Sequence, residues 1–165
     1  MPSMDDFKDF LATIRKQTGL EMLVPDEDGL VSFRVDDQYN VNLQFITATG
    51  KMLCFVEVCT LPADAGVAVY RDMMAGCLFG KETAGGYFAL EPKGNTILYN
   101  YLFDFEAANA EPENFVETLE NILQLVDIWA ARIRSGGEES PGEAPDASST
   151  TVEALQAQSV AFFRP

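Results

Sequence analysis

The stretch KMLCFVEVCTL (residues 51–61), followed by Pro62 and ADAGVAVYRDMMAGCL (63–78), decides the fold. Its first part carries apolar side chains at both odd and even positions, which is typical of a strand buried on both faces. We therefore expect this strand in the middle of a covered sheet. Pro62 cannot continue a strand ladder. Asp64 is then placed to cap a second helix, which Gly80 should end.

The sequence before this strand predicts one helix and two further strands. Ser3 suits a helix cap and Gly19 a helix end. Between them a stripe recurs at helical spacing: Phe7, Phe10, Leu11, Ile14 and Thr18. Residues 31–35 and 41–45 alternate apolar with polar side chains, which predicts strands with one solvated face. Short turns join them to the central strand, so the three strands should form an antiparallel meander.

The sequence after the second helix predicts a hairpin and a long helix. Strands are expected at 87–90 and 96–103, on either side of a turn. A third helix should begin at Pro112, a residue that suits the first helical turn. Its apolar stripe is the clearest in the chain: Phe115, Leu119, Ile122, Val126, Trp129 and Ile133. The predicted fold class is α+β: helix, three-stranded antiparallel meander, helix, two-stranded hairpin, helix.

A change in composition at Ser135 divides the chain into a domain (1–134) and a tail (135–165). The tail opens with SGGEESPGEAPDASSTT, which lacks core-forming residues, so we expect a flexible acidic segment. A short apolar end follows: Val152, Leu155, Val160, Phe162 and Phe163. This end either docks in a groove of the domain or stays frayed, since it is too short for a stable isolated helix.

Composition excludes several classes of function. The net charge of −15 argues against nucleic acid or an anionic membrane as partner. The chain has no histidine, which removes His-based catalysis and His-ligated zinc. Its three cysteines lack a Cys-x-x-Cys motif and predict reduced thiols, as in a cytoplasmic protein. No apolar run reaches the roughly 18 residues of a membrane span. We expect a soluble cytoplasmic protein without cofactor, metal site or enzyme activity.

Several local features resemble one family. The first helix carries FxxFLxxI (residues 7–14) and ends in Gly19-Leu20; an acidic glycine turn occupies 26–29. The central strand ends in Leu61-Pro62, and Gly85-Gly86 precedes the fourth strand. The last helix carries Leu119, Ile122 and Trp129. Across residues 4–134 the chain resembles the class I chaperones of type III secretion systems, the Tir-chaperone (CesT) family. It departs from the family pattern at Phe79-Gly80-Lys81, where relatives often carry Asn, and in its long tail.

The resemblance implies a homodimeric, ATP-independent chaperone. Such a protein binds the N-terminal, non-globular segment of a secreted effector and keeps it competent for the export apparatus. An extended peptide can add to a sheet edge while its alternate side chains fill apolar grooves. A second hypothesis is a regulatory or adaptor protein that shares the fold and binds an intracellular protein, with no secreted client. An enzyme is a third and weak hypothesis, because adjacent carboxylates such as Asp36 and Asp37 fall in a solvated turn.

Two sets of residues are candidates for binding. The client groove should be formed by the first helix and the meander, through Phe10, Ile14, Val31, Phe33 and Phe45. The alternative for these residues is ordinary core packing. The resemblance places the two-fold contact on the second helix, through Val67, Val69, Tyr70, Met73, Met74, Cys77 and Leu78. The alternative is that this helix only covers its own sheet.

Overall fold

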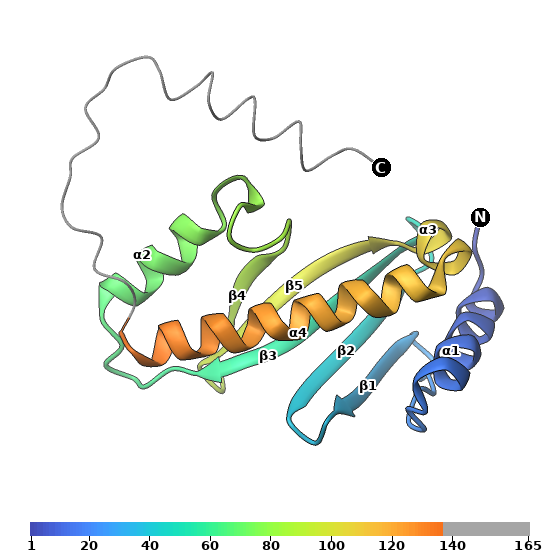
Figure 1. Cartoon of the computed structure of the whole chain (residues 1–165), viewed down its shortest axis with the longest axis horizontal. Coiled ribbons are helices and arrows are strands. Elements are labelled where there is room, and N and C mark those ends of the chain that lie inside the picture. Colours follow the sequence, from blue (N-terminus) through green and yellow to red (C-terminus); the bar gives the residue numbers. More distant parts are fainter. Residues whose placement is uncertain (137–165) are drawn as a thin grey trace, which may run out of the picture.

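The computed structural model describes residues 1–136, and the predictions for the rest of the tail lie outside these residues. The elements, in chain order, are α1 (Met4–Thr18), β1 (Leu30–Val35), β2 (Tyr39–Ile46), β3 (Lys51–Thr60), α2 (Val67–Gly76), the 3₁₀ turn η1 (Leu78–Gly80), β4 (Tyr87–Glu91), β5 (Thr96–Asp104), α3 (Phe105–Ala110) and α4 (Pro112–Arg134) (Figure 1). This confirms the predicted α+β class and element order. The short helix α3 is an addition.

The five strands form one antiparallel sheet in the order β1-β2-β3-β5-β4. The strand that decides the fold, β3, therefore lies in the centre, as its apolar sequence predicts. Val41 pairs with Val56, which pairs with Tyr99, so one row of buried side chains crosses three strands. The register between β3 and β5 shifts between Glu57 and Cys59. The strands β1 and β4 are the edges of the sheet.

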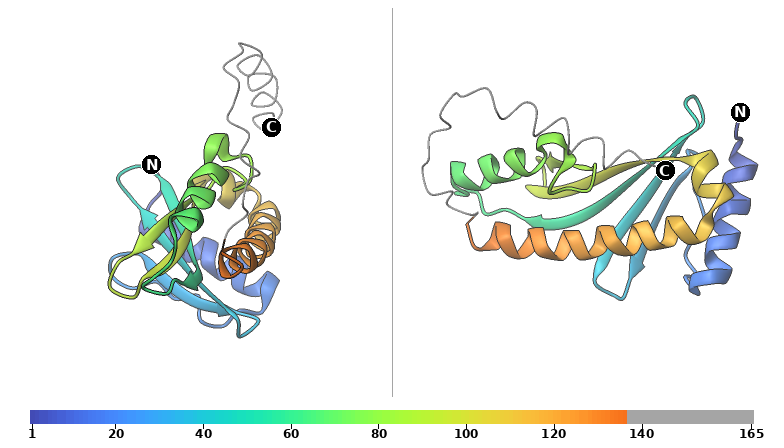
Figure 2. Two further views of the ribbon diagram at one scale, coloured as in Figure 1. Left: turned by 90° about the vertical axis from the view of Figure 1, so that its left-hand side faces the viewer. Right: turned by 45° about the horizontal axis from the view of Figure 1, so that its top comes forward.

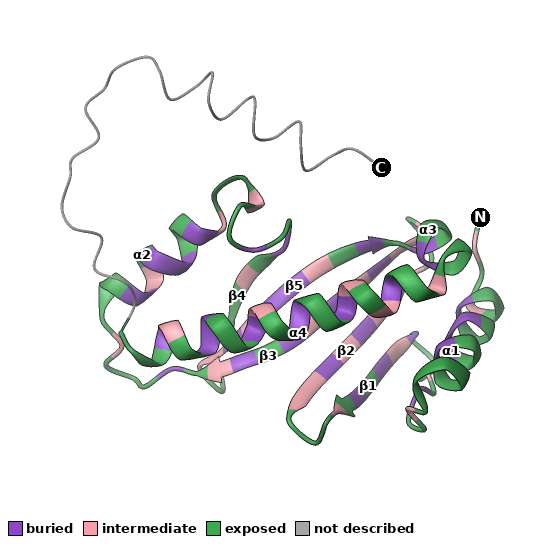
Figure 3. Cartoon of the chain, viewed as in Figure 1, coloured by how far each residue is buried: buried purple, intermediate pink, exposed green. Residues whose placement is uncertain are grey.

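The core lies between one face of the sheet and the helices. The long helix α4 runs across this face and packs against β3, and α1 lies beside it near β1 (Figures 1 and 2). Every member of the predicted α4 stripe is buried (Figure 3). On β3 the buried side chains alternate: Met52, Cys54, Val56 and Val58. Burial also raises the pKa of the Cys54 thiol to about 12.

The prediction that β3 is buried on both faces is wrong for the single chain. Leu53 and Phe55, on the face opposite α4, are only half-buried, and Glu57 is exposed. The reason is the layering, because α1 and α4 both lie on the other side of the sheet (Figure 2). Apolar residues in a strand thus predicted correctly that it is central, but not how many layers cover it.

The residue predicted to cap the start of the helix is found in that role at α1 but not at α2. Ser3 and Asp6 form a capping box at α1, with the Ser3 amide donating to Asp6 Oδ2 at 2.7 Å. Asp64 does not cap α2, which begins at Val67 with Gly66 as its cap residue. The intervening residues form their own turn, in which the Ala65 amide donates to the Pro62 carbonyl at 3.1 Å. The prediction that Gly80 ends the second helix is also wrong, because α2 ends at Gly76 and η1 follows.

Candidate functional site

An apolar groove lies between the C-terminal end of α1, the β1–β2 hairpin and the N-terminal half of α4. It has a volume of about 520 Å³. Its apolar lining residues come from all three elements and from the segment after α1: Ile14, Leu20, Leu23, Phe33, Val35, Leu43, Phe115, Val116, Leu119 and Leu123. A cavity of this size and lining suits several aliphatic or aromatic side chains.

The groove exists because α1 ends before it covers the hairpin. Gly19 has a φ of 74°, a left-handed conformation that glycine adopts without strain, and it turns the chain away from the helix axis. The segment that follows then places Leu20 and Leu23 along one wall. On the other side, α4 continues past the end of α1 and supplies the opposite wall (Figure 1).

One end of the groove is tied to α4 through Asp127. The hydroxyl of Tyr39 on β2 donates to Asp127 Oδ2, and Gln38 Nε2 donates to Asp127 Oδ1 at 3.3 Å. The bond to this carboxylate raises the pKa of Tyr39 to about 12, because it stabilises the protonated phenol. The β1–β2 hairpin is therefore fixed relative to α4 at this end.

The rim of the groove is polar and acidic. Gln17 and Thr18 of α1 and Gln124 of α4 line it, together with Asp36 and Glu120. Asp36 lies in the tight turn between β1 and β2, and Glu120 lies one residue after Leu119 on α4. Within residues 1–136, neither carboxylate forms a salt bridge or a side-chain hydrogen bond.

The edge strand β1 supplies backbone beside the groove. Since β1 pairs only with β2, one of its sides has no neighbouring strand in the described part of the chain. Phe33 and Val35 of this strand line the groove. An extended segment could therefore pair with β1 and direct alternate side chains into the groove.

The structure divides the five predicted client-binding residues into two groups. Ile14 and Phe33 line the groove. Phe10, Val31 and Phe45 are core residues that are at most 2% exposed. They belong to the layer between α1 and the sheet, where the Phe10 ring packs edge-on against Phe115 at 5.1 Å and a further aromatic ring stacks on Phe45. Ile14 and Phe33 are also buried, at 3% and 6% exposed, so all five residues belong to the core and these two also reach the groove.

The sequence pattern missed much of the groove lining. Leu20 and Leu23 follow the first helix without a periodic pattern, so no signal marked them. The contribution of α4 had a signal, because Val116 and Leu123 widen its apolar stripe beyond what one sheet face requires. The groove explains this width, because the two residues at the side of the stripe line the groove.

A second apolar hollow lies between α2 and the edge strand β4. It has a volume of about 350 Å³ and is lined by Tyr70, Met73, Met74, Cys77, Tyr87, Phe88, Ala89, Leu90 and Ile97. The predicted dimer residues are divided here as well. Val69 and Met73 are buried within the chain itself. Tyr70 and Cys77 are half-buried, and the remaining three are exposed: Val67 (72%), Met74 (76%) and Leu78 (60%).

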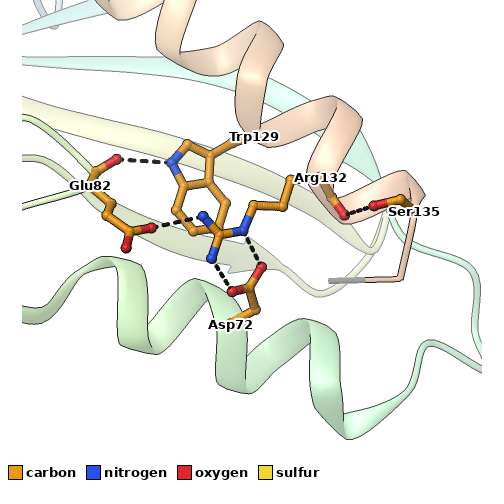
Figure 4. A network of polar contacts seen from close by, with 5 residues as sticks. All are labelled: Asp72, Glu82, Trp129, Arg132 and Ser135. Atoms are coloured by element: carbon orange, nitrogen blue, oxygen red, sulfur yellow. Dashed lines mark hydrogen bonds and ion pairs between the residues drawn. The ribbon is translucent and has the colours of Figure 1, made fainter. Parts of the chain in front are cut away.

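A polar network holds α2 and the loop after it against α4 (Figure 4). Arg132 of α4 makes a bidentate contact with Asp72 of α2, with its Nε donating to Asp72 Oδ2 at 2.6 Å. Its Nη1 donates to Glu82 Oε2 at 2.8 Å. The two carboxylates raise the pKa of Arg132 above its usual value, chiefly through the bond to Asp72. The network thus joins α4 to α2 and to the loop that follows α2, which precede Arg132 by 60 and 50 residues.

Trp129 completes this anchor. Its indole N–H donates to the Glu82 carbonyl at 3.0 Å, and the Arg132 guanidinium lies 4.4 Å from the centre of its ring (Figure 4). The ring lies directly against Gly76 of α2. The exposed face of α2 is therefore presented on a fixed support.

Comparison with known proteins identifies the family. The sequence profile of the Tir chaperone protein (CesT) family matches residues 9–130. A protein of Chlamydia pneumoniae, CPj0713/CpB0740, is 25% identical over 112 residues, which are 67% of this chain and 82% of the relative. The chain belongs to the Tir chaperone (CesT) family.

Solved structures show the same fold. A chain of the ExsC–ExsE complex superimposes with a TM-score of 0.68 at 20% identity, covering 81% of this chain and 97% of that one. A chain of the HopA1–SchA chaperone–effector complex superimposes with a TM-score of 0.59 at 18% identity, covering 82% of this chain and 99% of that one. A chain from the structure of the Yersinia pestis type III secretion chaperone SycH in complex with a fragment of YscM2 superimposes with a TM-score of 0.54 at 16% identity. The match covers 72% of this chain and 98% of that one. The resemblance predicted from sequence is confirmed.

Within residues 1–136, no group of three or more Asp, Glu or Cys side chains is arranged to hold a metal ion. None of the helices in this part of the chain is long and apolar enough to cross a membrane.

Proposed function

We propose that the protein is a cytoplasmic chaperone that binds the non-globular N-terminal segment of a type III secreted effector without catalysis. The observation that supports this most directly is the apolar groove beside the unpaired edge of β1. A client strand would pair with β1 and place its alternate apolar side chains in the groove. Binding of this kind hides apolar side chains from water and requires no covalent step and no nucleotide.

We extend this proposal to the dimer. The second apolar surface combines the exposed α2 residues with the other sheet edge, β4. A second copy of the chain could bury both at once, and adaptable Met side chains suit such a contact. The network of Asp72, Glu82 and Arg132 supports this assignment, because it holds α2 in place without using its exposed face.

The test of the client groove changes Val116, a lining residue that is only half-buried, so that an effect on binding can be separated from an effect on folding. Val116→Asn should weaken capture of an extended apolar peptide several-fold, because one buried apolar contact is replaced by an unpaired amide. Ile128→Asn is the matched control, since Ile128 lies on the same helix, is 66% exposed and does not line the groove. Fluorescence anisotropy with an effector-derived N-terminal peptide measures both.

Two results would contradict the proposal. Equal affinity of the Val116 and Ile128 variants, with both folded by circular dichroism, would place the client elsewhere. Capture of only intracellular, non-secreted proteins by the intact chain would favour the regulatory or adaptor hypothesis instead.

A further inference from the structure

The rim of the client groove carries charges that an apolar groove does not require. We propose that the groove selects client segments in which a lysine or arginine stands beside the apolar anchor residues. This inference rests on the proposed function, since it specifies the chemistry of the segment that occupies the same groove.

The first support is the placement of Asp36 and Glu120 on two different walls. Asp36 follows Val35 at the tip of the β1–β2 hairpin, and Glu120 follows Leu119 on α4. Each carboxylate thus stands next to an apolar lining residue. Both are exposed, and within the described chain neither has a salt bridge or side-chain hydrogen bond that would neutralise it.

The second support is the end of α1. Thr18 and Leu20, on either side of the helix end at Gly19, line the groove. The last carbonyl groups of a helix carry partial negative charge, which favours a cation nearby. The basic residues of the last turn, Arg15 and Lys16, are not among the residues that line the groove.

Charged groups of both signs surround the groove. The basic residue Arg34 donates from its guanidinium to the Asp37 carbonyl at 2.7 Å, in the turn that carries Asp36. Asp37 adjoins Asp36 in the turn, and Glu117 lies one turn before Glu120 on α4. Asp127 is already bound by Tyr39 and Gln38. No lysine or arginine of residues 1–136 lines the groove itself, so the charged side chains that an incoming cation meets along the lining are Asp36 and Glu120.

The overall charge of −15 does not by itself explain this rim. The hollow between α2 and β4 belongs to the same acidic chain, yet no Asp, Glu, Lys or Arg from the described residues lines it. A surface that pairs with a copy of itself gains nothing from like charges, whereas a surface that receives a different chain can use them. The acidic rim therefore fits a basic partner and disfavours a second copy of this acidic protein.

A lysine or arginine suits this geometry for a further reason. Its aliphatic stem can lie along the apolar lining while its charged end reaches the carboxylates at the rim. In an extended client, the cation would occupy a position two residues from an apolar anchor, so that both side chains lie on the face that meets the groove. An acidic residue at the same position would face Asp36 or Glu120 and be repelled.

The experiment compares three synthetic peptides that share two alternate leucines and differ only at the next alternate position, on the same face of the strand, which is Lys, Gln or Glu. Affinities are measured by fluorescence anisotropy on the full chain at low and high salt. We expect the Lys peptide to bind about three- to tenfold more tightly than the Glu peptide at low salt, with Gln between them. The difference should shrink at about 1 M salt, where screening acts over roughly 3 Å.

The double variant Asp36→Asn/Glu120→Gln should bind the Lys and Glu peptides with similar affinity. Its affinity for the Gln peptide should stay close to that of the wild type. The matched control is Asp64→Asn/Glu106→Gln, which makes the same two changes at exposed positions outside the groove. A preference that persists in the first variant, or disappears equally in the control, would overturn the assignment to the rim. Equal binding of the three peptides to the wild type would overturn the inference and leave the groove as client site.

Binding of none of the peptides would instead contradict the proposed function itself. A peptide with the sequence of residues 152–165 serves as competitor in the same assay, because it combines Phe162 and Phe163 with Arg164. If it binds more tightly than the Lys peptide, the preferred occupant is the chain's own end and the inference about a separate client is overturned.

Discussion

The packing of α2 against α4 requires that Gly76 carry no side chain. A Cβ atom at this position would overlap the ring of Trp129, which is 2% exposed and bonded to the Glu82 carbonyl. Because the ring is held on several sides, it cannot move aside at low cost. At this scale the packing requirement is steric, since Gly76 lies in a regular helix and needs no unusual φ.

We therefore predict that Gly76→Ala destabilises the fold by about 1–3 kcal/mol, the usual cost of overpacking. Thermal unfolding followed by circular dichroism should show a midpoint several degrees lower. Gly66→Ala is the control, because a Cβ at Gly66 meets nothing within 4 Å. An unchanged midpoint for Gly76→Ala would mean that α2 is not packed against Trp129 as described.

At the scale of elements, the sequence predicted a strand or helix best where a single apolar pattern ran through the whole element. The stripe of α4 and the apolar residues of β3 identified both elements, and the residues of β3 also indicated its central place in the sheet. The helix α3 was missed because Asp104, which ends β5, also caps it by accepting a bond from the Ala107 amide at 3.0 Å. A strand pattern runs directly into a helix there, with no glycine or proline to separate them.

The candidate groove could be predicted only in part, for a reason that also lies at this scale. Ile14 and Phe33 belong to periodic patterns, and both line the groove. Leu20 and Leu23 line it because Gly19 redirects the chain, and Leu119 because α4 crosses the sheet at one particular place. Such placements depend on how elements meet, and a local pattern does not contain that information.

The exposed face of α2 gives a prediction about assembly. Met74→Glu places a charge on the surface assigned to the second copy, and a buried unpaired charge is costly, so the variant should be monomeric. Light scattering at micromolar concentration measures this against the wild-type chain, for which we expect a dimer. Met22→Glu is the matched control, because Met22 is 74% exposed and lies in the segment after α1. A monomeric wild type would contradict the assignment.

At the scale of the whole molecule, the described core is complete by Ile133, near the end of α4. We predict that deleting residues 137–165 changes the thermal midpoint by less than about 2 °C, because surface changes away from the core are usually worth under about 0.5 kcal/mol. Circular dichroism and scanning calorimetry of the full and shortened chains test this. A fall of many degrees would show that the tail contributes to the folded core.

The groove and the proposed dimer surface lie at opposite edges of one sheet, β1 and β4 (Figure 1). A pair of chains joined at β4 would leave the two β1 edges as the outer ends of the assembly. A client with two suitable segments could then hold both ends at once, provided that the chain between the segments is long enough to span them. The second attachment would be intramolecular, and overall affinity could rise by ~10²–10⁴ without any new contact. Avidity would then make a modest groove sufficient for tight and still reversible retention.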